Sequence, residues 1–453
     1  APQRFRWVLP CPKGCEEVLA EEVRALDIEV SEARPTAVHA RGTLQEGYRL
    51  CLWSRVASRV LLPLVEIDAE NDTGLYEALR AVEWWTHFGA SQTFAIGSSQ
   101  APKSPFPSHY WVQREKDAIV DGFRAHSGER PSVDKRSPGL RFHLHIGERH
   151  HELSLDFSGE ALHRRGYRQS GGQAPLKENL AAAILYLAKW PEAARQGLPL
   201  MDPTCGSGTF LVEAALMATD CAPGLLRGRF GFERWLQHDA GAFERELVQA
   251  RASRKAECPA PIFGLDASVA ALANARENLQ AAGVDQHGSL ALRELARAEK
   301  PEERGLVVCN PPYGHRLGDE GSMFLFYQSL GDVLKRVFDG WTAYVLAPHG
   351  NLKDLGLRPV RRHVLYNGAI ECRLAEIPIR ASTSGGEGAG PAWRKPSKKA
   401  EMFANRVKKN KKKWGRWAKK NGVECYRIYD ADIPEYNVAV DRYASKAVVH
   451  IFQ

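Results

Sequence analysis

Hydrophobic residues follow two different periods along residues 1–160. Some stretches place them every three or four positions, as on one face of a helix, and others alternate them with polar residues, as in a half-buried strand. Helices are expected at residues 18–26, 46–53, 75–82 and 112–125. Strands are expected at residues 5–9, 37–40, 61–67, 93–97, 140–146 and 152–156. This succession predicts two small α+β units, residues 1–60 and 61–160, with a Ser-, Pro- and Lys-rich loop at 98–110.

The pattern changes over residues 165–380, where apolar runs alternate with helical stretches. Such alternation is typical of βαβ units, which build parallel sheets. Two apolar runs also flank Asn367 and Gly368, a pair that favours two-residue hairpin turns. Buried strands are expected at residues 198–201, 262–265, 306–309 and 342–346. We therefore predict an α/β domain whose parallel sheet ends in an antiparallel hairpin.

The composition is that of an ordinary globular protein. Apolar residues make up 44% of the 453 residues, and no apolar run approaches the roughly 20 residues that a membrane span needs. The first residues lack the apolar core of a secretion signal. Nine scattered cysteines, an odd number, predict reduced thiols and a cytoplasmic location. Cys11 and Cys15 lie close together, but no second Cys or His pair with zinc-ligand spacing follows, so we expect no metal.

The positive charge of the chain is concentrated near residue 400. The formal net charge is +8, yet residues 394–422 alone contain thirteen Lys and Arg against one acid, a net charge of +12 that leaves −4 for the rest. Residues 381–397 are rich in Ser, Gly, Pro and Lys and predict a linker. Residues 381–453 are thus expected to be a basic linker and C-terminal segment.

This basic segment can be a solvated or disordered tail, or it can bind a polyphosphate partner. Its interleaved aromatic residues favour contact with nucleic acid, because such rings can stack on bases. They are Trp393, Phe403, Trp414 and Trp417.

The first chemical motif runs from Asp202 to Thr209, between a buried strand and a helix. Gly206 and Gly208 allow a tight turn and a close approach of the backbone to a ligand. A dinucleotide site would want a third glycine, but position 211 is Leu. A nucleoside without a pyrophosphate does not need that glycine. The candidate cofactor contacts in this motif are Asp202, Thr204, Cys205, Gly206, Gly208 and Thr209.

An acid, Asp266, ends the next predicted strand. A carboxylate at this position can accept hydrogen bonds from both ribose hydroxyls of a nucleoside. It can also cap the following helix, although Ser268 is an equally suitable cap. The wide spacing between Gly208 and Asp266 requires an inserted segment, which residues 220–258 supply.

The most specific motif is Asn310-Pro311-Pro312-Tyr313, directly after a buried strand. An aromatic exocyclic amine is a poor nucleophile because its lone pair is delocalised into the ring. Two acceptors, the Asn310 side-chain oxygen and the Pro311 carbonyl, can hold that amine so that its lone pair is available. Tyr313 can stack on the base. The motif predicts methyl transfer to an amine, in which positioning supplies most of the rate and no metal is required.

Together these residues resemble the THUMP-domain ribosomal RNA guanine-N2 methyltransferases, and the resemblance covers nearly the whole chain. It implies a Rossmann-like class I methyltransferase domain preceded by α+β ferredoxin-like and THUMP domains that bind RNA. The matching stretches are residues 52–59, 116–121, 162–168, 222–225, 227–229, 310–314 and 424–443.

The resemblance also implies a cofactor, a substrate and further site residues. The cofactor is S-adenosyl-L-methionine, and the substrate is a guanine of 23S ribosomal RNA. By position, Lys177, Glu178 and Asn179 precede the first helix beside the cofactor, and Glu294 is the acid near the adenine. In the fused members of this family a second methyltransferase, which makes m7G, follows as a further domain.

Three alternatives share parts of this pattern. A methyltransferase acting on DNA adenine or protein glutamine would share residues 310–313, but the two N-terminal units and the basic segment favour folded RNA. Another RNA, such as a tRNA guanine, is a second alternative. A non-catalytic RNA-binding scaffold is the third, although it would be expected to have decayed motifs, and both motifs are intact.

Overall fold

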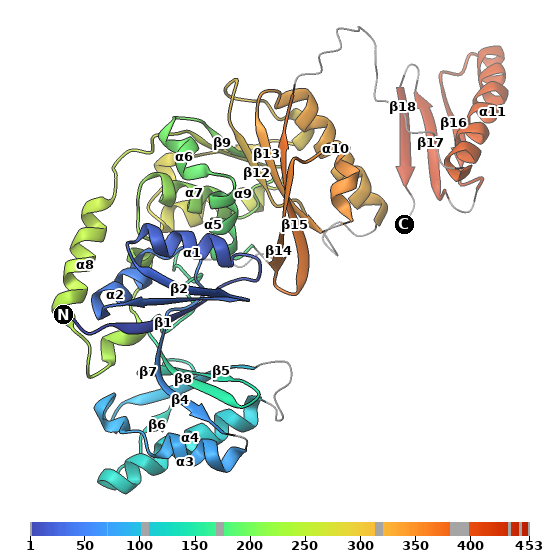
Figure 1. The fold of residues 1–453 in the computed structure, drawn as a ribbon. Coiled ribbons are helices and arrows are strands. Elements are labelled where there is room, and N and C mark those ends of the chain that lie inside the picture. Colours follow the sequence, from blue (N-terminus) through green and yellow to red (C-terminus); the bar gives the residue numbers. More distant parts are fainter. Residues whose placement is uncertain are drawn as a thin grey trace. The chain divides into compact units, whose positions relative to one another are not determined.

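The fold is that of a computed structural model, which describes residues 2–69, 71–100, 108–168, 176–312, 320–348, 350–380, 398–433, 436–443 and 446–451. Contacts between Cα atoms divide the chain into a large unit, Ala1–Ala381, and a C-terminal unit, Ser382–Gln453 (Figure 1). No helix in the described ranges combines the length and the apolar character that a membrane span requires.

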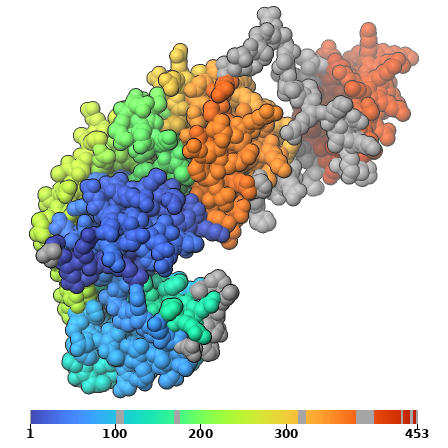
Figure 2. Space-filling model, in the orientation of Figure 1, coloured from blue at the N-terminus to red at the C-terminus, as the bar shows by residue number. Residues whose placement is uncertain are grey.

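The first 156 residues of the large unit share one eight-stranded sheet, with the strand order β2-β3-β1-β4-β8-β7-β5-β6. Its strands are β1 (Phe5–Pro10), β2 (Glu29–Arg34), β3 (Ala37–Gly42), β4 (Leu61–Asp68), β5 (Thr93–Gln100), β6 (Ser132–Val133), β7 (Leu140–Ile146) and β8 (His150–Asp156). The two expected α+β units are therefore joined, because β1 pairs with β4 where Val8 lies opposite Leu61. Figure 2 shows residues 1–60, in dark blue, against the lighter blue residues that follow them.

Four helices accompany this sheet: α1 (Glu16–Ala25), α2 (Leu44–Trp53), α3 (Asp72–Arg80) and α4 (Ser108–Ser127). The start of α2 is fixed by a capping box, in which Thr43 accepts from the Glu46 amide and the Glu46 side chain accepts from the Thr43 amide. The expected loop at 98–110 is shorter than predicted, because β5 continues to Gln100 and α4 already begins at Ser108. Residues 101–107 lie outside the described residues.

The second sheet has seven strands in the order β11-β10-β9-β12-β13-β15-β14. They are β9 (Leu200–Asp202), β10 (Ile262–Asp266), β11 (Gly288–Leu292), β12 (Leu306–Cys309), β13 (Thr342–Pro348), β14 (Arg361–Asn367) and β15 (Ile370–Pro378). The first five are parallel, and β15 is antiparallel to both β13 and β14. The hairpin turns at Asn367 and Gly368, whose φ is +65°. The predicted parallel sheet with a terminal hairpin is confirmed.

Helices pack around this sheet, and the strand order reverses between β9 and β12. The helices are α5 (Glu178–Leu187), α6 (Trp190–Arg195), α7 (Thr209–Ala218), α9 (Val269–Ala281) and α10 (Glu320–Val337). In an open α/β sheet, the crevice beyond the carboxyl ends of the strands at such a reversal is where ligands bind.

The inserted segment connects the second sheet to the N-terminal residues. It contains the short 3-10 helices η2 (Pro223–Leu226) and η3 (Gly231–Arg234) and the helix α8 (Ala240–Ser253). Glu246 of α8 is buried and forms an ion pair with Arg49 of α2, at 3.0 Å. Tyr48 of α2 bonds to His238 Nδ1 at 2.9 Å. One continuous hydrophobic cluster therefore extends from β1 through the insertion to the second sheet.

The C-terminal unit is a folded α+β unit. It contains α11 (Lys398–Asn421) and the antiparallel strands β16 (Cys425–Asp430), β17 (Val438–Tyr443) and β18 (Lys446–Ile451). Phe403 of α11 stacks on Tyr436 with ring centroids 4.6 Å apart and meets Tyr429 at 4.8 Å. The interpretation of the basic segment as a disordered tail is thus wrong for α11. Trp393 and the expected linker at 381–397 lie outside the described residues.

Candidate active site

A cavity of about 570 Å³ lies beyond the carboxyl ends of β9, β10 and β12. This is the position predicted by the reversal of the strand order. It is lined by Leu176, Asp202, Pro203, Thr204, Cys205, Gly206, Ser207, Thr209, Phe210, Asp266, Ala267, Ser268, Glu294, Leu295, Asn310, Pro312 and Phe326. Residues from three separate sequence motifs thus come together in one pocket.

The loop after β9 is shaped by its two glycines. Gly206 and Gly208 have φ angles of +52° and +76°, a region that residues with a side chain rarely adopt. A Cβ atom at Gly208 would lie 3.0 Å from Ala275 Cβ of α9, so this glycine lets two helices approach each other. A Cβ atom at Gly206 would meet no atom within 4 Å, which leaves open space beside the loop.

Asp266 at the end of β10 holds this loop in place. Its Oδ2 accepts a hydrogen bond from the Gly206 amide at 3.0 Å, and its Oδ1 accepts from the Ser268 amide at 2.8 Å. Each carboxylate oxygen keeps acceptor capacity for a ligand hydroxyl. The cap of α9 is Ser268, whose hydroxyl accepts from the Ala271 amide at 3.2 Å. Asp266 is therefore not needed as the cap of α9, and its carboxylate is available to a ligand.

Asp202 at the end of β9 is almost fully buried, with 2% of its surface exposed. Burial, and then the nearby charge of Asp266, raise the pKa of Asp202 to about 8, against the hydrogen bond from the Thr204 amide, which favours the charged form. Burial likewise raises the pKa of the Cys205 thiol, so that this cysteine is an apolar wall of the pocket. A cation close to Asp202 would offset the cost of its charge.

Asn310 follows β12 directly, and its side chain lines the cavity. Its Oδ1 atom is buried and has no hydrogen-bond partner in the described part of the chain. An unpaired buried acceptor is costly and is expected to have a ligand partner. Pro312 also lines the cavity, whereas Pro311 is buried beside it. Tyr313 lies outside the described residues, so its stacking role stays a prediction.

Several lining residues were not identified from the sequence. Phe326 of α10, together with Leu176, Phe210 and Leu295, supplies apolar surface on which a purine ring could pack. Leu295 and Phe326 come from η5 (Leu295–Arg297) and α10, where nothing in the local pattern marks them as ligand contacts. Glu294, the predicted adenine-side acid, precedes η5, is exposed and lines the same cavity.

Lys177, Glu178 and Asn179 are not among the residues that line the cavity. Lys177 directly precedes α5 as its N-cap, whereas Glu178 and Asn179 lie in the first turn of that helix. Glu178 forms an ion pair with Arg168 at 2.8 Å, and Arg168 also donates to Thr209 Oγ1 at 3.2 Å. The Asn179 side-chain Nδ2 donates a hydrogen bond to Ser58 Oγ at 3.1 Å. Their part in cofactor binding stays a prediction.

The arrangement is suited to a nucleoside that carries a positive charge. Acids end two strands, the buried Asp202 and the partly exposed Asp266, and the backbone is open at Gly206. Apolar side chains form part of the wall, and the unpaired Asn310 amide oxygen belongs to the same lining. Within the described ranges, no three His, Cys, Asp or Glu side chains gather as metal ligands would. All nine cysteines lie in those ranges and are free thiols, as predicted.

The strand order and this pocket define a class I methyltransferase domain, the class that uses S-adenosylmethionine. Three sequence families match successive parts of the chain. Residues 6–61 match the RlmL ferredoxin-like domain, residues 69–156 the THUMP domain, and residues 165–376 the methyltransferase domain described as RMKL-like. The chain therefore contains a ferredoxin-like, a THUMP and a methyltransferase domain, in the order that the resemblance implied.

Two curated relatives are named ribosomal RNA large subunit methyltransferase K/L. The relative from Pseudomonas paraeruginosa is 45% identical and is aligned over 97% of this chain and 63% of its own length. The relative from Syntrophotalea carbinolica is 47% identical over 100% of this chain and 64% of its own. The chain thus spans less than two thirds of the length of these relatives. Among solved structures, the protein SMU.472 in complex with SAH is 26% identical, with a TM-score of 0.75, over 84% of this chain and 100% of its own.

Proposed function

We propose that this protein transfers the methyl group of S-adenosylmethionine to the exocyclic N2 amine of a guanine in 23S ribosomal RNA. The observation that carries the proposal is the unpaired Asn310 Oδ1 atom in the cofactor pocket. A guanine presents an NH₂ group, and this oxygen is an acceptor for one of its two N–H bonds. The RNA substrate is supported by the THUMP domain and by the names of the relatives.

The residues of the pocket divide into two roles. Asp202, Gly206 and Asp266 would hold the cofactor, whose sulfonium supplies an electrophilic methyl carbon. Asn310 and the Pro311 carbonyl would orient the amine so that its lone pair points at that carbon. Since the protein contributes orientation and desolvation, no covalent intermediate with the chain is needed.

The family resemblance implies a narrower substrate than the names of the relatives give. The proposed product is m2G, at guanosine 2445 of the large-subunit RNA. We also propose that the chain corresponds to the RlmL half of a K/L enzyme, with an m7G-forming domain as its fused or separate partner. A ribosomal RNA substrate would place the protein in the bacterial cytoplasm.

The decisive experiment is a labelled-methyl assay on large-subunit RNA that lacks modifications, followed by nucleoside analysis. The expected product is N2-methylguanosine, in protein-free RNA or an early assembly intermediate. A different methylated nucleoside would reject the guanine-N2 assignment, and labelling of tRNA in preference would reject the ribosomal substrate. No incorporation with any RNA, although the cofactor binds, would favour the non-catalytic scaffold.

A further inference from the structure

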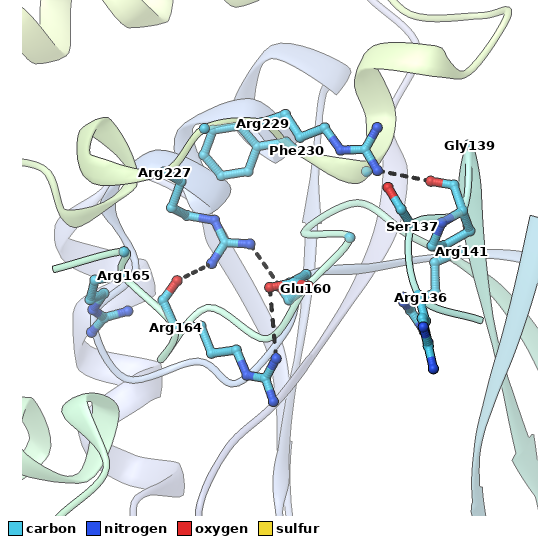
Figure 3. Close-up of a pocket in the computed structure, with 15 residues that line it drawn as sticks. Arg136, Ser137, Gly139, Arg141, Glu160, Arg164, Arg165, Arg227, Arg229 and Phe230 are labelled. Atoms are coloured by element: carbon cyan, nitrogen blue, oxygen red, sulfur yellow. Dashed lines mark hydrogen bonds and ion pairs between the residues drawn. The ribbon is translucent and has the colours of Figure 1, made fainter. Parts of the chain in front are cut away.

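A second cavity, of about 310 Å³, lies where the THUMP domain meets the inserted segment (Figure 3). Its walls come from the loop before β7, from the chain that follows β8, and from the segment between η2 and η3. Six arginines and one acid, Glu160, line it, and no residue of the methyltransferase pocket does. The arginines are Arg136, Arg141, Arg164, Arg165, Arg227 and Arg229.

Two of these arginines build the walls. Arg165 is buried, donates to the Leu162 carbonyl at 2.8 Å and forms an ion pair with Glu213 at 3.4 Å. Arg227 donates hydrogen bonds from both terminal nitrogens to backbone carbonyls, including those of Arg164 at 2.8 Å and Glu160 at 3.0 Å. These bonds fix the chain after β8 to the insertion and keep the cavity in shape.

The other arginines keep unused donors. The side chains of Arg136 and Arg141 form no hydrogen bond or ion pair in the described part of the chain. Arg229 makes one bond, to the Pro138 carbonyl at 2.9 Å, and Arg164 is a distant 3.9 Å from Glu160. In Figure 3, Arg136 and Arg141 lie on one side of Glu160 and Arg164 lies on the other.

The lining carries an excess of positive charge, six arginines against Glu160, and the carboxylates of Asp134 and the buried Asp156 act on Arg136 and Arg141 from outside it. Within the described residues, Arg136, Arg141, Arg227 and Arg229 have no carboxylate at ion-pair distance. Nearby His163 has a pKa of about 4, lowered first by burial and then by the charges of Lys177, Arg165 and Arg164. Like charges in a concave site repel one another, and an anion placed among them relieves that repulsion.

We infer that this cavity, the arginine pocket, binds one backbone phosphodiester of the RNA, with Arg136 and Arg141 as the principal donors. A guanidinium presents paired N–H groups that match two phosphate oxygens. The inference rests on the proposed RNA substrate and extends it. Both donors belong to the THUMP domain, and Arg227 connects the adjoining wall of the pocket to the inserted segment. One bound phosphate would therefore fix the position of the RNA relative to the THUMP domain and to the inserted segment. Such contacts fix register and carry no sequence information.

The test compares two double variants that remove equal charge from the THUMP domain. Arg136→Gln/Arg141→Gln removes the two lining arginines whose side chains form no hydrogen bond or ion pair among the described residues. Arg80→Gln/Arg130→Gln is the matched control, because both residues are exposed, neither lines the pocket, and neither side chain forms a hydrogen bond or ion pair among the described residues. The dissociation constant of unmodified large-subunit RNA is measured without cofactor over a range of salt concentrations. We expect the pocket variant to bind about tenfold more weakly at low salt, with the slope of log K against log salt reduced by about 0.7 to 0.9.

The control variant should change the slope little. Equal losses in both variants, or an unchanged slope in the pocket variant, would overturn the inference. Titration of the wild-type protein with inorganic phosphate distinguishes a free anion from an RNA phosphate. If phosphate binds in the sub-millimolar range, the pocket variant loses that binding, and the salt slope of RNA binding is unchanged, then the pocket is a small-anion site and the RNA contact is rejected. Melting curves and cofactor calorimetry check that the variants are folded. Since methyl transfer is not measured, a failure here is independent of the product analysis proposed above.

Discussion

At the scale of single residues, Asn310 separates the chemistry of the pocket from its binding function. Its Oδ1 atom is buried and forms no hydrogen bond in the described part of the chain, so it adds little to the stability of the cofactor-free protein. We predict that Asn310→Ala reduces methyl transfer by at least about 100-fold, because the amine loses an oriented acceptor. Cofactor affinity, measured by calorimetry, should stay within about twofold, since the assignment gives this side chain no cofactor contact.

A conservative variant provides the control. Asn310→Asp keeps an acceptor at the same place and should retain more activity than Asn310→Ala. Full activity of the alanine variant would contradict the assignment of Asn310 to the amine.

A second residue-scale prediction concerns the raised pKa of Asp202. The value of about 8, against 3.8 for an ordinary aspartate, means that the cofactor-free pocket holds a protonated acid at neutral pH. A cationic cofactor binds the ionised form better. Its dissociation constant should therefore fall as the pH rises from about 6 to about 8.5, by at most about tenfold per unit.

Stability should change in the opposite direction. Between pH 3.8 and about 8, Asp202 keeps a proton in the native state that it has lost in the unfolded chain. The free energy of unfolding therefore decreases as the pH rises through this range. Asp202→Asn should flatten both curves, as calorimetry and urea titrations at several pH values would show. The same pH dependence in the variant would assign the effect to another group.

Much of the pocket could be predicted because its residues are defined by their order along the chain. Asp202 and Asp266 end their strands and Asn310 directly follows another, and the carboxyl ends of parallel strands share one edge of the sheet. Phe326 could not be predicted in this way. It reaches the cavity only through the packing of α10, which is a tertiary property.

At the scale of elements, the docking of the insertion on α2 depends on a glycine. A Cβ atom at Gly224 in η2 would lie 2.6 Å from Leu52 Cα and 2.8 Å from the Leu52 carbonyl oxygen, so backbone would have to shift. We predict that Gly224→Ala lowers the free energy of unfolding by about 1 to 3 kcal/mol. Urea denaturation provides the measurement.

Gly228 lies in the same insertion and serves as the control. A Cβ atom there would meet nothing within 4 Å, so Gly228→Ala should change stability by no more than about 0.5 kcal/mol. Equal effects of the two substitutions would show that close packing at Gly224 is not the cause.

Elements with a clear apolar period were predicted well, and those without one were missed. β2 has the sequence Glu-Val-Ser-Glu-Ala-Arg, is mostly exposed, and becomes a strand through its pairing with β3. β6 has only two residues, beside β5. Such edge strands depend on neighbours that are distant in sequence, so their own residues carry little signal.

At the scale of the whole molecule, the C-terminal unit presents a strongly basic helix. α11 packs through Phe403 on its own sheet, while Trp414 and Trp417 remain 39% and 48% exposed. The sequence could not distinguish these two kinds of aromatic residue, because both occur among the same lysines. We propose that the exposed face of α11 binds RNA.

This proposal gives a prediction for four exposed cations. Replacing Lys408, Lys412, Arg416 and Lys419 by Gln should leave the unit folded and reduce the salt dependence of RNA binding by about one unit of slope or more. Filter binding at several salt concentrations measures the slope. An unchanged slope would identify α11 as a solvated helix without an RNA contact.

The shared sheet of the first 156 residues has a consequence for engineering. Two families match its two halves, yet β1 pairs with β4, and α8 is anchored to α2 by the buried Glu246. A chimaera that exchanges RNA recognition between relatives should therefore not be cut near residue 60, where the seam would divide a hydrogen-bonded sheet. A chimaera would have to exchange residues 1–160 and residues 220–258 together, because the two segments pack on each other.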